Sequence, residues 1–313
     1  MKKNKKAKAL VLLSGGLDSI LAVRLLQEQG IEVVAINFRT NFCGPSKARP
    51  AAQALGVPLR EVDIRNEFIE VLKKPKHGYG AGLNPCIDCH ALMLKKAAEI
   101  TRREGYDFVA TGEVLGERPM SQYRKALKIV EKEAGLEGYL LRPLSAKLLE
   151  PTVAEHDGRI NREKLLALSG RNRKPQMELA KKFGIKQYPS PAGGCALTQA
   201  GFVERLRELI GQKPDFNSED TDLVRIGRHF WIEGRQIIIG RNKEENQILE
   251  AIFKKGDILI KPKSFIGPSA LLRGEKIDSQ IVQRIKELIF KFSSGAKNLD
   301  ISELNFKTRG RIK

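Results

Sequence analysis

Two glycines, an aspartate and two serines stand together in the stretch LSGGLDS, between an apolar run and a helix-like run that begins at Ile20. Glycine lets a backbone approach an anion closely, and the first N–H groups of a helix carry partial positive charge. An aspartate beside bound phosphates suits Mg²⁺, although an N-cap role alone would also explain it. Neither a Walker A lysine nor a G-x-G-x-x-G pattern occurs at this turn. We therefore predict a phosphate site made by Ser14, Gly15, Gly16, Asp18 and Ser19.

Four cysteines are too few for a disulfide framework in 313 residues, so the thiols are expected to be free, metal-bound or catalytic. Cys86 and Cys89 form a Cys-x-x-Cys pair at the start of a predicted helix, where the helix charge favours thiolate. Cys195 follows two glycines. Cys43, just after the second predicted strand, could face the same edge of the sheet or equally well be a small buried residue. Zinc would normally need a second pair. A [4Fe-4S] cluster on Cys86, Cys89 and Cys195, and persulfide chemistry on the same thiols, remain as alternatives.

The charge balance is lopsided: 56 Lys and Arg against 37 Asp and Glu give a net charge of +19. A salt-bridged surface would need a more even balance, so a polyanionic partner is favoured, and nucleic acid is the commonest. At 6% aromatic residues, a broad base-stacking platform is not expected. No apolar stretch is long enough to span a membrane, and the N-terminal apolar run is too short for a signal peptide. We expect a cytoplasmic protein without a membrane partner.

The elements that must position these residues alternate along the first half of the chain. Such alternation indicates a doubly wound, mostly parallel α/β sheet, whose strand ends carry the ligand site. A further helical pattern covers 161–184. The predicted strands are 9–13, 31–38, 58–64, 106–112 and 139–144, and the predicted helices are 19–29, 47–55, 66–74, 86–104 and 121–135.

Beyond about Phe202 the pattern changes to short strand-like runs and a last helix over 278–292. This predicts a smaller α+β domain, with boundaries at 1–200 and 201–313. Its basic side chains are candidates for phosphate contacts with RNA. They are Arg225, Arg228, Arg235, Arg241 and Lys243.

The S-G-G-L-D-S turn after a first strand resembles the pyrophosphate loop of the PP-loop ATPases, the N-type ATP pyrophosphatases of the adenine nucleotide alpha hydrolase-like fold. The resemblance implies that ATP, with Mg²⁺, is cleaved between its α and β phosphates to adenylate a carbonyl oxygen. It also implies that Asn37 and Phe38, at the end of the second strand, line the adenine pocket.

Three further motifs narrow the resemblance. NPC-x-x-C is similar to the tRNA 2-thiouridylases, and TGEVLGERPMSQ with LLRPL resembles the catalytic domain of the tRNA 4-thiouridine synthases. This implies that Thr111, Gly112 and Glu113 lie beside ATP and that Ser121 and Gln122 line the nucleotide or RNA-base side. The resemblance does not extend to the N-terminal RNA-binding module or the C-terminal rhodanese domain of the 4-thiouridine synthases, so the substrate docking and sulfur delivery of that family do not carry over to this sequence.

The C-terminal part resembles the NFACT-R domain, a module linked to RNA with an I-x-V-G-R-N-x-x-x-N core. Here that core comprises Ile239, Gly240, Arg241, Asn242 and Asn246. The usual D-[IL]-W-[FL]-H segment is replaced by 257–261, DILIK, so its aromatic and histidine roles do not carry over.

These observations favour an ATP-dependent tRNA sulfurtransferase in which Cys86, Cys89, Cys195 and Asp18 carry the chemistry. The sulfur donor would be sulfide or a persulfide carrier such as a cysteine desulfurase system, and a homodimer is compatible with the sequence. Two alternatives stay open: a PP-loop amide-forming ligase acting on a small molecule, and a non-catalytic RNA-binding protein with a relic nucleotide loop.

Overall fold

The computed structural model describes residues 6–43, 47–188, 195–274, 279–296 and 305–310. The chain divides into two compact units, Met1–Gln199 and Ala200–Lys313. In the described residues, no helix is long and apolar enough to cross a membrane. The two glycines that precede Cys195, Gly193 and Gly194, lie outside the described residues.

Unit 1 is built on a parallel sheet with the strand order β3-β2-β1-β4-β5 in its described part. Neighbouring strands are in register through Leu10, which pairs with Val34 on one side and Val109 on the other. β2 and β3 lie on one side of β1, and β4 and β5 lie on the other. The strand that precedes the glycine loop is therefore at the centre of the sheet, where the direction of the chain connections changes. The strands are β1 Lys8–Leu12, β2 Glu32–Arg39, β3 Leu59–Asp63, β4 Phe108–Ala110 and β5 Leu140–Leu141.

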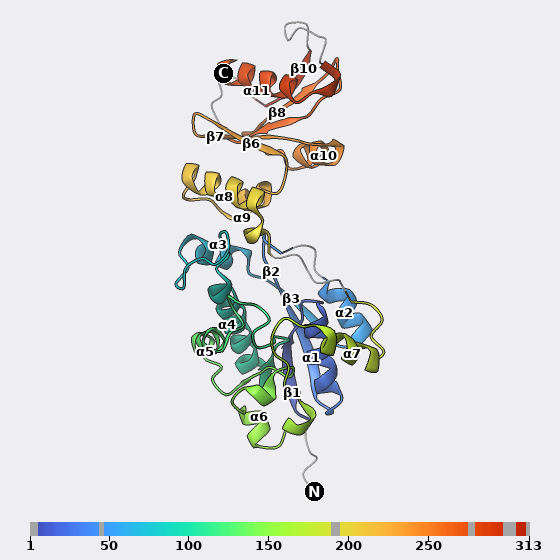
Figure 1. The fold of residues 1–313 in the computed structure, drawn as a ribbon. Coiled ribbons are helices and arrows are strands. Elements are labelled where there is room, and N and C mark those ends of the chain that lie inside the picture. The colour runs from blue at the N-terminus through green and yellow to red at the C-terminus, as the bar shows by residue number, and fades with distance from the viewer. Residues whose placement is uncertain (1–5, 44–46, 189–194, 275–278, 297–304, 311–313) are drawn as a thin grey trace. The chain divides into compact units, whose positions relative to one another are not determined.

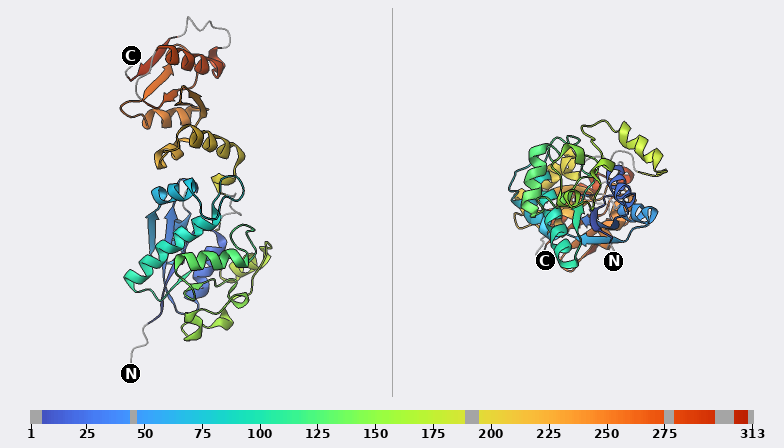
Figure 2. Two further views of the ribbon diagram at one scale, coloured as in Figure 1. Left: turned by 90° about the vertical axis from the view of Figure 1, so that its left-hand side faces the viewer. Right: turned by 90° about the horizontal axis from the view of Figure 1, so that it is seen from below.

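Helices cover both faces of this sheet (Figure 1). Successive apolar side chains of β1 point to opposite faces, so each face needs a cover. Ala9 and Val11 pack with the side of α1 and α2, whereas Leu10 packs with α4 and α5. Figure 2 (left) views the molecule from the side of α4 and α5. The α/β fold class is confirmed. The helices are α1 Leu17–Gln27, α2 Ala48–Leu55, α3 Arg65–Lys73, α4 Cys86–Glu104, α5 Arg124–Ala134, α6 Val153–His156 and α7 Lys174–Lys182.

The strands predicted over 106–112 and 139–144 are shorter in the structure, and two helical patterns of unit 1 differ from their predicted extent. The helical pattern over 161–184 contains only a 3-10 turn, Arg162–Lys164, and α7, because the chain between them turns at Gly170, whose φ is +78°. The predicted helix over 121–135 begins only at Arg124, since Ser121 and Gln122 are buried in the loop before it.

Unit 2 contains an antiparallel sheet with the order β10-β8-β9-β7-β6, which confirms the predicted second α+β fold. Ile237 and Ile239 pack against α11, and Ile238 packs on the opposite face with Leu249 of α10. The elements are α8 Ala200–Gln212, α9 Ser218–Leu223, β6 Arg228–Ile232, β7 Arg235–Ile239, α10 Lys243–Ala251, β8 Ile258–Pro262, β9 Ala270–Leu272, α11 Ser279–Lys291 and β10 Phe306–Arg309.

Candidate active site

The loop between β1 and α1 is tightly packed around its glycines. Gly15 has a φ of +79°, and a Cβ on it would come within 2.3 Å of the Lys47 backbone. The Ser19 hydroxyl donates to the Gly16 carbonyl at 2.8 Å, and the Ser14 hydroxyl oxygen accepts from the Gly16 N–H at 3.2 Å. The loop therefore delivers the N-terminus of α1 in one defined conformation, as an anion site requires.

The ends of β2 and β4 meet this loop. The Asn37 amide donates to the Leu13 carbonyl at 2.8 Å. A Cβ on Gly112 would lie 2.5 Å from the Ser19 nitrogen, so only glycine lets Thr111–Gly112 touch the first turn of α1. Phe38 is different: its side chain is 7% exposed and packs in the core, which leaves only its backbone for a ligand.

Asp18, in the first turn of α1, is largely buried and has unusual surroundings. Its Oδ2 lies 3.8 Å from Nη2 of Arg173, at the start of α7. Burial raises the pKa of Asp18, and the charges of Arg173 and, more weakly, Arg118 partly offset this. Within the described residues, Oδ1 of Asp18, Nε of Arg173 and Oε1 of the buried Gln176 have no hydrogen-bond partner. Buried polar atoms are normally paired, so this group suits a polar ligand.

Arg173 and Gln176 were not predicted from the sequence. Their signal is weak: a basic run, GRNRK, precedes a proline at the start of α7. They come from a part of the chain about 150 residues beyond the loop, and only the contact between α1 and α7 brings them to Asp18.

Glu113 lies beneath the loop instead of on a surface that could meet RNA. Its side chain is buried and accepts hydrogen bonds from Thr111 at 3.0 Å and Arg142 at 2.9 Å, and its other oxygen lies 2.9 Å from His90 Nδ1. Burial opposes its charge, but the Arg142 charge and the His90 hydrogen bond together lower the pKa of Glu113 to about 2. Arg142 also pairs with Glu131 at 3.0 Å. Glu113 is thus a charged support that ties β4 to α4.

Ser121 and Gln122 are also buried, at 1% and 5% exposed. Gln122 Oε1 accepts from the Arg118 backbone N–H at 3.1 Å, so it shapes its own loop. The Ser121 hydroxyl has no partner among the described residues.

Three segments bring the thiols together. The Phe42 carbonyl accepts from the Ala196 N–H at 3.2 Å, and the Leu83 N–H donates to the Leu197 carbonyl at 3.0 Å. The Cys195 thiol points to the Phe42 carbonyl, with Sγ 3.6 Å from the oxygen. As a result the other three thiols lie close enough to Cys89 for their charges to add to the effect of burial and raise its pKa. They are Cys43, Cys86 and Cys195.

The predicted thiolate character of the Cys86–Cys89 pair is wrong for this structure. Burial raises the pKa of both thiols, well above the usual value for Cys89, and for Cys86 the nearby Arg118 offsets this only in part. Desolvation outweighs the helix N-terminus because α4 begins inside the protein. Among the described residues, no group of three or more Cys, His, Asp or Glu side chains is arranged to hold a metal ion.

In unit 2 the predicted RNA-contacting arginines have internal partners. Arg241 pairs with Glu245, Arg225 lies 5.4 Å from the ring centre of Phe202, and Arg228 lies 4.6 Å from that of Phe292. Arg235 pairs with Glu233 at 3.3 Å, and Lys243 opens α10. The asparagines of the same motif are structural: Asn242 caps α10, and Asn246 accepts from the Ser269 N–H at 2.9 Å.

Comparison with known proteins finds a matching family model for each unit. Residues 7–156 match the tRNA methyl transferase HUP domain, and residues 227–311 match the NFACT protein RNA binding domain. The predicted resemblance to a PP-loop domain followed by an NFACT-type domain is confirmed.

Curated relatives include tRNA-specific 2-thiouridylases MnmA. That of Syntrophus aciditrophicus is 27% identical over 65% of this chain and 56% of its own length, and that of Caldicellulosiruptor saccharolyticus is 28% identical over 71% and 65%. This chain thus spans less than two thirds of either relative. A solved 4-thiouridine synthetase–RNA complex with bound ATP is 19% identical, with a TM-score of 0.39 over 69% of this chain and 53% of that chain.

Proposed function

We propose that this chain, which joins a HUP domain of the tRNA methyl transferase type to an NFACT-type domain, is an ATP-dependent tRNA sulfurtransferase. The main support for the proposal is a series of contacts that connects the glycine loop to the thiols. Gly112 touches Ser19, Thr111 bonds Glu113, and Glu113 bonds His90, the neighbour of Cys89. One rigid network therefore joins a phosphate site to a group of thiols.

The loop of Ser14–Ser19 would hold the phosphates of ATP, and the unpaired Asp18 oxygen fits a role in holding Mg²⁺. When bound, Mg²⁺ would neutralise charge on the leaving pyrophosphate. A base carbonyl oxygen of the tRNA attacks the α-phosphorus, and the bond to the bridging oxygen of the β-phosphate breaks. The base carbon then carries AMP as a leaving group, which a plain carbonyl oxygen would not be.

Sulfur would reach the activated carbon from the thiol group. In the persulfide version, a persulfide carrier first transfers sulfane sulfur to one cysteine, and the terminal sulfur of the resulting persulfide attacks the carbon as AMP leaves. A second thiolate then attacks Sγ of that cysteine, which breaks the bond to the transferred sulfur, forms a disulfide and releases the thiolated base; an external thiol reductant restores both cysteines. Cys89 is a candidate for the second role because the other thiols lie near it; burial raises its pKa, so it must lose its proton before it can attack. The described thiol arrangement does not match a metal site, so no step here passes through an iron–sulfur cluster.

The test is thiolation of an unmodified tRNA transcript with ATP and either sulfide or a persulfide carrier, followed by mass spectrometry of the nucleosides. We expect one thionucleoside, with release of AMP and pyrophosphate. Cys89→Ser should remove it, whereas the matched control Cys43→Ser should retain most of it, because Cys43 is exposed. ATP turnover without RNA and without a thionucleoside would instead support an amide-forming ligase. RNA binding without any turnover would support a relic loop.

Anaerobic purification with iron and acid-labile sulfide analysis separates the two sulfur routes. Activity in an iron-free protein supports the persulfide route, whereas activity that requires bound iron and sulfide contradicts it.

A further inference from the structure

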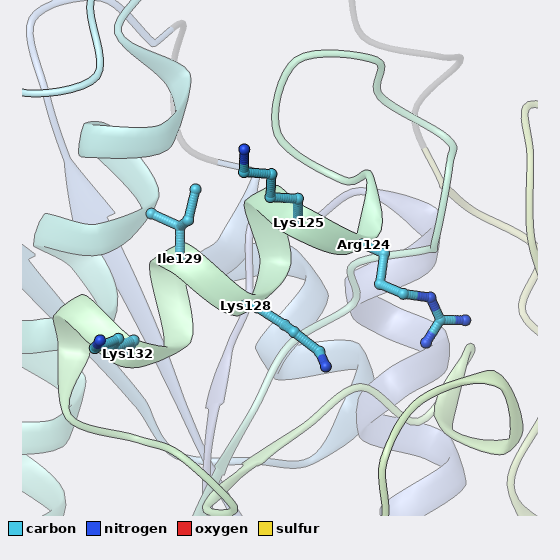
Figure 3. A pocket seen from close by; sticks show the side chains of 5 residues that line it. All are labelled: Arg124, Lys125, Lys128, Ile129 and Lys132. Carbon is cyan, nitrogen blue, oxygen red and sulfur yellow. The ribbon is translucent and has the colours of Figure 1, made fainter.

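The outward face of α5 in unit 1 carries a row of basic side chains. Arg124, Lys125, Lys128 and Lys132 are all exposed, at helical spacings of three and four residues. The opposite face, which includes Leu127 and Val130, is buried against the sheet. Figure 3 shows the four basic side chains extending from the helix. Lys125 and Lys132 are about 10 Å apart along the helix axis.

The three lysines of this row differ from neighbouring basic residues in their ion pairing. Basic residues nearby are paired: Lys76 with Glu133, and Lys147 with Glu163. Among the described residues, no carboxylate lies within ion-pair distance of Lys125, Lys128 or Lys132. Like charges three and four residues apart repel one another and weaken a helix. The row therefore does not serve the stability of α5, which suggests an anionic partner.

The surface around the row is hollowed. A hollow of about 470 Å³ is lined by Ile129 and the four basic residues. A second, of about 430 Å³, shares Arg124, Lys128 and Lys132 with the first, but it is also lined by Glu131, Glu137, Glu150 and Glu155, which would repel a polyanion. The four basic side chains around the first hollow therefore form a basic ridge, along which an extended polyanion could lie.

The ridge leads directly to the candidate active site. The loop before α5 contains Arg118, whose charge acts on both Asp18 and Cys86. Tyr123, the last residue before the helix, is 41% exposed and offers a ring for contact with a base. Phosphate contacts on α5 would therefore hold a strand whose next nucleotides face the loop and the thiols.

We propose that the α5 ridge, Arg124, Lys125, Lys128 and Lys132, docks the sugar-phosphate backbone of the RNA substrate. This inference rests on the proposed function. Lysine ammonium groups bind phosphates as point charges without reading sequence, so the ridge positions the RNA while the active site selects the base.

The experiment measures binding of an unmodified tRNA transcript to the full chain by fluorescence anisotropy over a range of salt concentrations. The variant is Lys125→Gln/Lys128→Gln/Lys132→Gln. The matched control is Lys181→Gln/Lys182→Gln/Lys186→Gln, which removes the same charge from exposed positions of unit 1 outside α5. A triple lysine-to-arginine variant of the ridge tests whether charge alone suffices.

We expect the ridge variant to bind roughly 10-fold more weakly near physiological salt, with the slope of log affinity against log salt reduced by about 1 for each lysine that contacts a phosphate. The arginine variant should bind as the wild type does. In thiolation assays, KM for tRNA should rise while kcat stays unchanged. Equal binding by the ridge variant and the control, or an unchanged salt slope, overturns the inference.

These experiments can contradict the ridge proposal without contradicting the proposed function, and the reverse. If the wild type makes a thionucleoside and the ridge variant binds tRNA normally, the ridge proposal falls and the proposed function stands. If the ridge variant loses tRNA binding but the wild type thiolates no tRNA, the ridge stands and the proposed function falls.

Discussion

The two sheets of the protein use their polar residues in opposite ways. In unit 1 the strands are parallel, so the loops after β1, β2 and β4 all leave at one edge. That edge gathers Ser14, Asn37 and Gly112 and, in the part of the chain that the structure describes, leaves several buried polar atoms near Asp18 without a partner. In unit 2 the strands are antiparallel, and successive strand ends lie on opposite sides. Its motif residues bond to neighbouring groups of the same unit, as Arg241 does to Glu245.

One buried titratable group in each unit shows how the surroundings set its charge. Glu113 in unit 1 is charged, because Arg142 and His90 compensate for its burial. His229 in unit 2 is held neutral: burial lowers its pKa to about 4, although a hydrogen bond to the Ile226 carbonyl opposes this. Glu113 therefore stays charged inside unit 1, whereas His229 stays neutral inside unit 2.

The largest effect should come from Asp18, at the reactive edge of unit 1. Asp18→Asn should reduce ATP-dependent pyrophosphate release roughly 100- to 1,000-fold, because it removes the carboxylate that would hold Mg²⁺ beside the leaving pyrophosphate. Asp63→Asn, at the end of β3, is the control, since Asp63 is already bonded to Arg65. If Asp18→Asn keeps near-normal turnover, the loop is not the reactive centre.

Loss of the buried charge of Glu113 should destabilise unit 1. Glu113→Gln should lower the free energy of unfolding by about 3 kcal/mol, because Arg142 loses a buried partner. Glu131→Gln should cost less, since Glu131 is more exposed than Glu113. Chemical denaturation measures both; equal losses would contradict a special role for Glu113.

Acid should affect the two units at different pH values. The pKa of His229 is about 4 when folded, below its usual 6.5, so the unfolded chain takes up the proton first and unit 2 loses stability as the pH falls from about 6.5 to 4. The pKa of Glu113 falls from 4.5 to about 2 on folding, so the stability it contributes is complete above about 4.5 and is lost towards 2.

Trp231, the single tryptophan, lies in unit 2 and reports its unfolding by fluorescence. We expect this transition at milder acid than the loss of helical circular dichroism from unit 1. His229→Gln should flatten the fluorescence change between pH 6.5 and 4; an unaltered profile would assign the acid sensitivity to another group.

The smallest effect should come from the arginines of unit 2. Because Arg225, Arg228 and Arg241 already contact Phe202, Phe292 and Glu245, replacing all three by glutamine should weaken tRNA binding only about 3-fold. Anisotropy under the conditions used for the α5 ridge gives the comparison. A loss larger than that of the ridge variant would show that unit 2 is the main docking surface.

The sequence by itself determined the sheet of unit 1, the loop and the thiol pair. Alternating apolar runs specify buried strands and helices, and local residues alone form the turn at Ser14–Ser19. The helix over 86–104 was predicted with its observed bounds. These features depend on periodicity and on short-range backbone geometry, which one sequence carries.

Tertiary structure alone decided what surrounds those residues. Arg173 and Gln176 reach Asp18 only because α7 packs on α1, and Glu113 became a buried support because Arg142 and His90 close around it. The thiols of the Cys86–Cys89 pair have raised pKa values, which the helix start alone would not suggest, because α4 begins inside the protein. Burial and long-range pairing set these properties, and both depend on residues far apart in the chain.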